Sequence, residues 1–141
     1  MKKALVITGI LSAVLLIAVA CNKSGGSVSN GTAIKTVAVD SLNATLSNGT
    51  GQLKQGDQEV TLAFTDASGK PVDVGAVSLN FQMPQMGSMA AMNDSVTFTT
   101  TNAPGVYRGK VNIESGGEWQ AQLAYEGPAG KGKTTFSVTA R

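Results

Sequence analysis

Short runs in which hydrophobic and polar residues alternate constrain the fold of this chain more than any other feature. In the run EVTLAFTD (59–66), every second residue from Val60 to Phe64 is hydrophobic. The same alternation recurs in residues 77–83, 95–100, 105–113, 118–126 and 134–140. Alternation of this kind is typical of strands with one buried face, and a further short strand is expected near NATLS (43–47). The turns DASGKP, NAPG, ESGG and GPAGKG contain the glycine or proline that a chain reversal needs. The pattern predicts an all-β fold, an antiparallel β-sandwich of about seven strands.

The first twenty residues have the features of an export signal. A basic start, MKK, precedes an uninterrupted apolar run over residues 4–20, and Cys21 follows small residues. A cysteine at this place resembles the lipid-modified cysteine of bacterial lipoproteins, so we expect residues 1–20 to be a signal peptide and Cys21 to carry the lipid, palmitate included. The alternative is an uncut anchor, although residues 4–20 would only just span a bilayer, which needs about 20 apolar residues. Both interpretations tether the protein on the extracytoplasmic side of a membrane. Because Asn22 and not aspartate follows Cys21, we expect the periplasmic face of the outer membrane if the host has two membranes.

The composition of the residues after the signal predicts a linker followed by one domain with a net charge near zero. Residues 21–33 contain the cysteine and a stretch rich in Gly, Ser and Asn, which predicts a flexible linker, and residues 34–141 are long enough for one core. Eleven Lys and Arg against nine Asp and Glu give +2, and removing Lys2 and Lys3 leaves nine of each sign. No basic stripe for nucleic acid is present. With one cysteine and no histidine in the sequence, an internal disulfide and the usual zinc, copper(II) and general-base residue are excluded.

All four internal methionines lie in the segment FQMPQMGSMAAMND, three residues apart each time, as Met83, Met86, Met89 and Met92. Thioether sulfur is a soft, neutral donor that suits Cu(I) and Ag(I). It has no proton to lose, and it is more durable than cysteine in an oxidising compartment. Pro84 and Gly87 interrupt regular structure and would permit a loop in which sulfurs converge. The segment is therefore a candidate Cu(I) or Ag(I) site.

Two other interpretations of the methionine segment remain open. Met83 continues the inward face of its strand, whereas Met86, Met89 and Met92 are expected in the loop that follows it. Methionine fills irregular gaps in cores, and SMAAM could form one helical turn capped by Ser88, with its methionines packed against the sandwich. In the third interpretation the segment is an adaptable surface for a protein partner.

Other motifs favour structural roles, and we expect no enzymatic activity. GPAGKGKT (127–134) fits the phosphate-binding loop pattern, but no helix follows it, so a hairpin is expected and nucleotide binding is not. Asp66 is expected to bond the turn amides of DASGKP. Tyr107 and Trp119 fall on inward faces.

From residue 49 onward, the order of features resembles the YtkA-like domain family, which includes the domain of FixH-type proteins. The resemblance is carried by QLKQGDQEVTLAFTDASGKPV, then VSLNFQMPQMGSM, then GVYRGKVNIESGGEWQAQLAYE. It implies an immunoglobulin-like sandwich outside a membrane, linked to copper handling, metal efflux or assembly of a respiratory oxidase. The implied partner is a membrane protein of one of these systems. Some relatives carry a histidine near the Met-Pro-x-Met segment, which this chain lacks.

Overall fold

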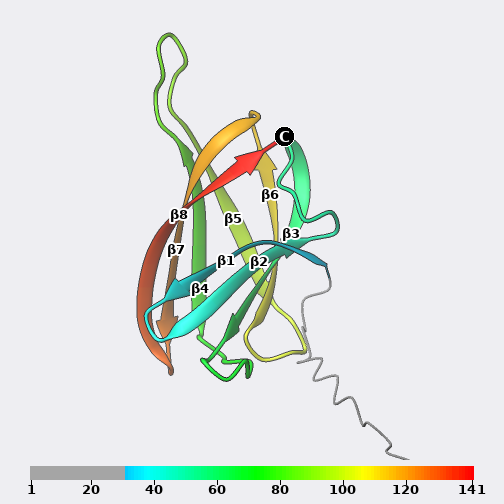
Figure 1. Cartoon of the computed structure of the whole chain (residues 1–141), viewed down its shortest axis with the longest axis vertical. Coiled ribbons are helices and arrows are strands. Elements are labelled where there is room, and N and C mark those ends of the chain that lie inside the picture. The colour runs from blue at the N-terminus through cyan, green and yellow to red at the C-terminus, as the bar shows by residue number, and fades with distance from the viewer. Residues whose placement is uncertain (1–30) are drawn as a thin grey trace, which may run out of the picture.

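The computed structural model describes residues 31–141, which form eight antiparallel strands (Figure 1). Their bounds are β1 Thr32–Val39, β2 Leu42–Asn48, β3 Gly56–Thr65, β4 Ala76–Met83, β5 Met92–Thr100, β6 Val106–Ile113, β7 Gly117–Gly127 and β8 Gly130–Ala140. The predicted all-β class and antiparallel arrangement are confirmed. β1 was not among the expected strands, and it begins slightly before the expected domain start at residue 34.

The strands form one continuous sheet in the order β1-β2-β3-β6-β5-β4-β7-β8. β5 connects the two layers, because its first half, Met92–Val96, pairs with β4, whereas its second half, Thr97–Thr100, pairs with β6. β1 and β8, at the two ends of this order, come into contact with each other. The sheet is therefore nearly closed around its core, and the expected sandwich consists of two parts of a single bent sheet.

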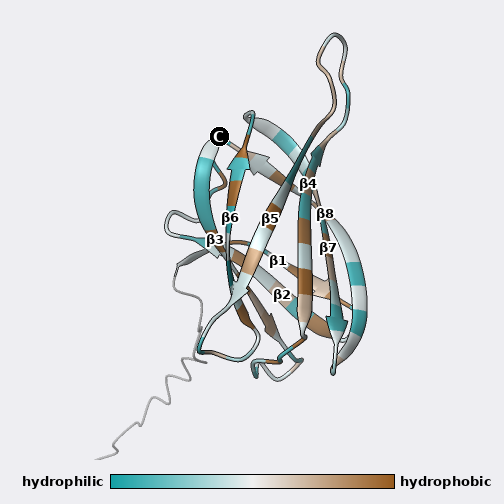
Figure 2. Ribbon diagram, turned by 180° about the vertical axis from the view of Figure 1, so that it is seen from behind, coloured by the Kyte–Doolittle hydropathy of each residue, from teal (hydrophilic) through white to brown (hydrophobic). Residues whose placement is uncertain are grey.

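The side chains of both layers alternate between core and solvent, as the period of two predicts. Along β4 and β6, hydrophobic and hydrophilic bands alternate (Figure 2). Trp119 is fully buried near the start of β7, and its indole N–H donates to the Ser115 carbonyl at 2.9 Å. The largest fully buried side chains are Trp119, Phe64, Phe81, Leu46, Leu53, Leu62, Leu79, Ile113 and Leu123.

A glycine permits the close packing of β5 on β6. Gly109 pairs with Phe98, and a Cβ on Gly109 would lie only 2.5 Å from Val96 Cγ1 and 2.8 Å from Phe98 Cδ1. Only a residue without a side chain fits under Val96 and Phe98, at the point where β5 passes from one layer to the other.

Residues 31–141 contain no helix long and apolar enough to cross a membrane. The expected signal peptide, Cys21 with its expected lipid, and most of the expected linker lie outside the described residues.

Candidate functional site: a methionine hairpin

The four methionines occur as two cross-strand pairs on one β-hairpin. Met83 is the last residue of β4 and pairs with Met92, the first residue of β5. Beyond them the two arms continue, and Met86 pairs with Met89 in an isolated antiparallel bridge. We call Met83 and Met92 the base pair, and Met86 and Met89 the tip pair. Met92, which we expected in the loop, thus belongs to a strand.

A tight turn closes the tip and replaces the helical turn that SMAAM suggested. The Met89 N–H donates to the Met86 carbonyl at 2.9 Å. Gly87 has φ +56° and takes the first central position of this two-residue turn, the position that glycine occupies in type II′ hairpins. Nothing lies within 4 Å of where a Gly87 Cβ would stand. Gly87 therefore faces open space on this side of the turn.

The base pair belongs to the core. Met83 is 4% exposed, and its methyl carbon lies 3.1 Å from the position that a Cβ on Gly117 would occupy. Met92 is partly buried and packs against the same core. The prediction that Met83 faces inward is confirmed.

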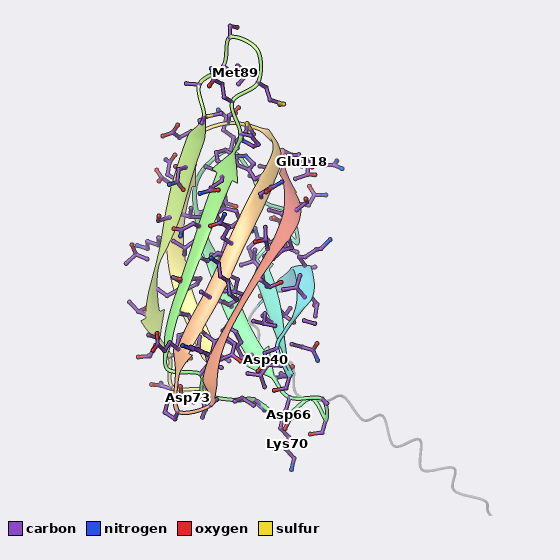
Figure 3. The ribbon with its side chains drawn as sticks, turned by 90° about the vertical axis from the view of Figure 1, so that its left-hand side faces the viewer. Asp40, Asp66, Lys70, Asp73, Met89 and Glu118 are labelled. Carbon is purple, nitrogen blue, oxygen red and sulfur yellow. The ribbon has the colours of Figure 1, made fainter. Side chains whose placement is uncertain are left out.

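The tip pair is exposed to solvent at the far end of the molecule. Met86 is 62% and Met89 49% exposed, and among the described residues they are the exposed large hydrophobic side chains. Figure 3 shows Met89 on a hairpin that extends beyond the sheet, whereas Asp66, Lys70 and Asp73 lie at the opposite end.

The hairpin geometry separates the four sulfurs into two sets. Side chains directly opposite each other on antiparallel strands have Cβ atoms about 5 Å apart, which brings the two thioethers of each pair within reach of one ion. The tip and base pairs are three residues apart along each arm, or about 10 Å at 3.3 Å per residue. A single ion therefore has two thioether ligands within one pair, and convergence of all four would require the hairpin to refold.

The surroundings of the tip are uncharged. No Asp, Glu, Lys or Arg occurs between Met83 and Asn93, and the described residues contain no group of three or more His, Cys, Asp or Glu side chains that could hold a metal ion. A hard divalent cation, which prefers several oxygen ligands, has no carboxylate to bind there. The donor set at the tip suits a soft monovalent ion.

A hollow of about 410 Å³ lies at the base of the hairpin. Its walls combine three amide side chains with apolar residues: Gln82, Asn93, Gln120, Met83, Pro84, Ala91 and Met92. Gln82 falls on the outward face of its strand by alternation, but no pattern in the sequence connects it with Asn93 or Gln120. Their proximity depends on strand register, in which Gln82 pairs with both.

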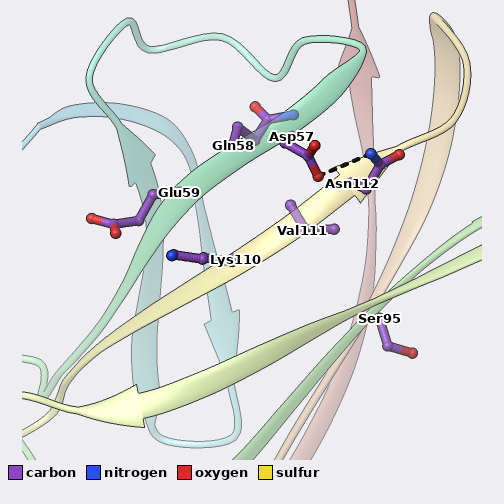
Figure 4. Close-up of a pocket in the computed structure, with 7 residues that line it drawn as sticks. All are labelled: Asp57, Gln58, Glu59, Ser95, Lys110, Val111 and Asn112. Atoms are coloured by element: carbon purple, nitrogen blue, oxygen red, sulfur yellow. Dashed lines mark hydrogen bonds between the residues drawn. The ribbon is translucent and has the colours of Figure 1, made fainter.

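A second hollow, of about 530 Å³, lies over β3, β6 and β5 (Figure 4). Its charged groups are held by neighbours: the Asn112 amide donates to Asp57 Oδ1 at 2.9 Å, and Arg108 lies 3.4 Å from Glu59. Lys110 pairs with Glu59 in the strand register. These contacts form a charged ladder across two strands and contain no nucleophile with an adjacent base.

The aspartates that flank the DASGKP turn have the structural roles expected of turn residues. Asp66 Oδ1 accepts hydrogen bonds from the N–H groups of Ser68 and Lys70 at 2.9 and 3.0 Å and from the Ser68 hydroxyl at 2.6 Å. The Ser68 hydroxyl, with the Lys70 amide, holds the pKa of Asp66 below its ordinary value. Asp73 instead accepts from the Tyr107 hydroxyl at 3.1 Å.

Two buried tyrosines flank Phe64 at the end away from the methionine tip. Their ring centroids lie 6.0 Å (Tyr107) and 5.6 Å (Tyr125) from that of Phe64, both edge-on. Burial raises the pKa of both, and the hydrogen bond to Asp73 raises that of Tyr107 further. The Tyr125 hydroxyl is buried without a hydrogen-bond partner among the described residues.

The GPAGKGKT segment is a hairpin, as expected. Gly127 pairs with Gly130 where β7 turns into β8, and both lysines of the motif lie within β8. No helix follows the loop, so it lacks the N–H groups that would receive a phosphate.

Comparison with known proteins gives a family for this arrangement. A sequence model of the family described as YtkA-like matches residues 36–124, which is more than half of the chain. Among solved structures, the ZirS C-terminal domain aligns over 100% of this chain and 87% of its own, with a TM-score of 0.44 and 14% sequence identity. No curated protein matches the chain.

Proposed function

The chain belongs to the YtkA-like family, and from this premise we propose that it is a non-enzymatic extracytoplasmic module that binds or relays Cu(I) or Ag(I). In this proposal the lipid on Cys21 tethers the domain to the membrane, and the methionine hairpin acts beside a membrane protein of copper handling, metal efflux or respiratory oxidase assembly.

The observation that carries the metal proposal is the tip pair. Met86 and Met89 lie opposite each other at the end of a projecting, uncharged hairpin, and both are about half exposed or more. Thioethers prefer Cu(I) among the biological metals. Two neutral sulfurs bind less tightly than thiolates would, which suits a site that has to pass its ion on.

The base pair offers a second thioether pair on the same hairpin. Met83 and Met92 line the hollow beside the amides of Gln82, Asn93 and Gln120. In a relay, the tip captures the ion and the base pair holds it closer to the body of the domain. The core packing of Met83 makes this second position the less accessible one.

Silver titration tests the metal proposal, with Ag(I) as the air-stable probe. All proteins carry Cys21→Ser so that the only thiol is absent. We expect M86L/M89L to weaken Ag(I) binding about tenfold or more, equivalent to at least ~1.4 kcal/mol, while M83L/M92L, the matched control, weakens it less. Equal affinity of the parent and the tip variant would refute binding at the tip.

The competing function is a protein-interaction module without a metal, in which the hairpin completes the core or docks a partner. The exposed apolar area of Met86 and Met89 favours this second function. Replacing residues 84–91 by Asn-Gly would join Met83 to Met92 through the two residues that hairpin turns prefer, leaving the sheet intact.

The two functions differ in their response to leucine. Partner capture by apolar contact survives M86L/M89L and is lost in the Asn-Gly hairpin, whereas Ag(I) binding is weakened in both. Capture of a membrane partner that persists after the hairpin is shortened would exclude the tip as its docking surface.

A further inference from the structure

The tip pair is also the place where the folded domain presents thioether sulfur to dissolved oxidants. Met86 and Met89 are 62% and 49% exposed, while Met83 is 4% exposed and Met92 is partly buried. Methionine sulfur is oxidised to the sulfoxide in proportion to its access, and reductases restore it. The thioethers of the tip pair are therefore far more accessible to oxidants than those of the base pair.

We propose that Met86 and Met89 form a reversible oxidation site, whose substrates are two-electron oxidants of the hydroperoxide and hypohalous acid class. A sulfur lone pair attacks the terminal peroxide oxygen, the O–O bond breaks, and an S–O bond forms. Sulfur loses two electrons and the peroxide gains them. With hydrogen peroxide, the products are the sulfoxide and one water.

The position of the pair allows this change without loss of the fold. A sulfoxide is polar and disrupts a core, but Met86 and Met89 lie outside the buried core. The turn between them is closed by the backbone bond from Met89 to Met86, which oxidation of the side chains leaves intact. Oxidation of Met83, by contrast, would place a polar group against the core.

Oxidation also changes what the tip binds, a consequence that rests on the proposed function. Metal binding and oxidation both draw on the lone-pair electrons of the thioether sulfur, and a bound cation makes those electrons less nucleophilic. Oxidation converts a soft sulfur donor into a polar sulfoxide. The oxidised tip thus releases a soft cation, and a bound cation shields both sulfurs from oxidation. Reduction returns the site to its metal-binding form.

The test uses the detergent-solubilised full chain carrying Cys21→Ser. The chain is oxidised with hydrogen peroxide for increasing times, and peptide mapping by mass spectrometry measures the sulfoxide at each methionine. We expect Met86 and Met89 to oxidise about tenfold faster than Met83, or more, in line with their access to solvent. The urea midpoint should be unchanged when only the tip is oxidised, and reductases for both sulfoxide epimers should return the original mass. Comparable rates at Met83 and the tip, unfolding upon tip oxidation, or irreversibility would each overturn the proposal.

A second arm separates this proposal from the metal proposal. With Ag(I) present, the rates at Met86 and Met89 should fall while the rate at Met92 changes less, and the oxidised chain should lose Ag(I) affinity. If the reduced chain fails to bind Ag(I), the proposed function fails. The proposal of an oxidation site then still stands or falls on three results: the faster oxidation of Met86 and Met89, the unchanged urea midpoint, and the return of the original mass after reduction. If Ag(I) binds equally to both forms, the link between oxidation and metal release is refuted.

Discussion

Substitution of individual methionines by alanine should separate the core role of Met83 from the surface role of Met86. Met83 is 4% exposed, so Met83→Ala removes contacts from nearly the whole side chain. Gly117, beside its methyl group, has no side chain to fill the space. Large-to-small changes of this kind cost about 2–5 kcal/mol. Because Met83 also lines the hollow at the hairpin base, the new cavity opens to water, and we expect the lower part of that range, about 2–3 kcal/mol.

Urea unfolding measures this difference. With a slope of about 1–3 kcal/mol per molar for small proteins, Met83→Ala should lower the midpoint by about 0.7–3 M. Met86→Ala, at a surface position with 62% exposure, should change the free energy of unfolding by less than about 0.5 kcal/mol.

Met83→Leu is the matched control for loss of volume, and it should cost under about 1.5 kcal/mol because it nearly conserves the side-chain volume. Similar midpoints for Met83→Ala and Met86→Ala would refute the assignment of the two residues to core and surface. A larger loss in Met86→Ala would mean that the hairpin tip packs on the domain.

Four further predictions concern the rest of the fold. Gly109→Ala should cost about 1–3 kcal/mol through overpacking against β5, measured by the urea midpoint; an unchanged midpoint would show that β5 can move away. Tyr107→Phe removes the hydrogen bond to Asp73 and should lower the free energy of unfolding by about 0.5–1.5 kcal/mol. Tyr125→Phe should be neutral or stabilising, because it removes a buried hydroxyl without a partner among the described residues. A lower melting temperature for Tyr125→Phe than for Tyr107→Phe would contradict this assignment. Since both tyrosine pKa values are raised in the folded state, the unfolded chain releases these protons first, and stability should fall as the pH rises above about 10, more steeply than in the double Phe variant. Asp66→Ala should lower the free energy of unfolding at neutral pH. Because the folded-state pKa of Asp66 is lowered, this loss relative to the parent should shrink as the pH falls below about 4. A loss that is independent of pH would exclude the charged carboxylate as its cause.

The fold could be predicted from the sequence where a local pattern determines it. Alternation placed Trp119 and Met83 in the core, and the turn residues marked where strands end. The pattern could not show that β5 pairs with β4 in its first half and with β6 in its second. That change of partner brings Val96 and Phe98 of β5 against Gly109 of a different strand, and contacts between residues far apart in sequence leave no local period.

The candidate site was recognised by composition, but its geometry follows from a symmetry in the sequence. The segment MPQMGSMAAM is symmetric in its methionines about Gly87 and Ser88, and glycine followed by serine is a two-residue hairpin turn signal. Once the turn is placed there, Met86 must face Met89 and Met83 must face Met92, as the structure has them. The three-residue spacing on each arm then leaves one pair in the core and the other in solvent. The methionine segment that suggested one soft-metal site therefore supports two separate pairs, of which the exposed one is available for an ion, an oxidant or a partner.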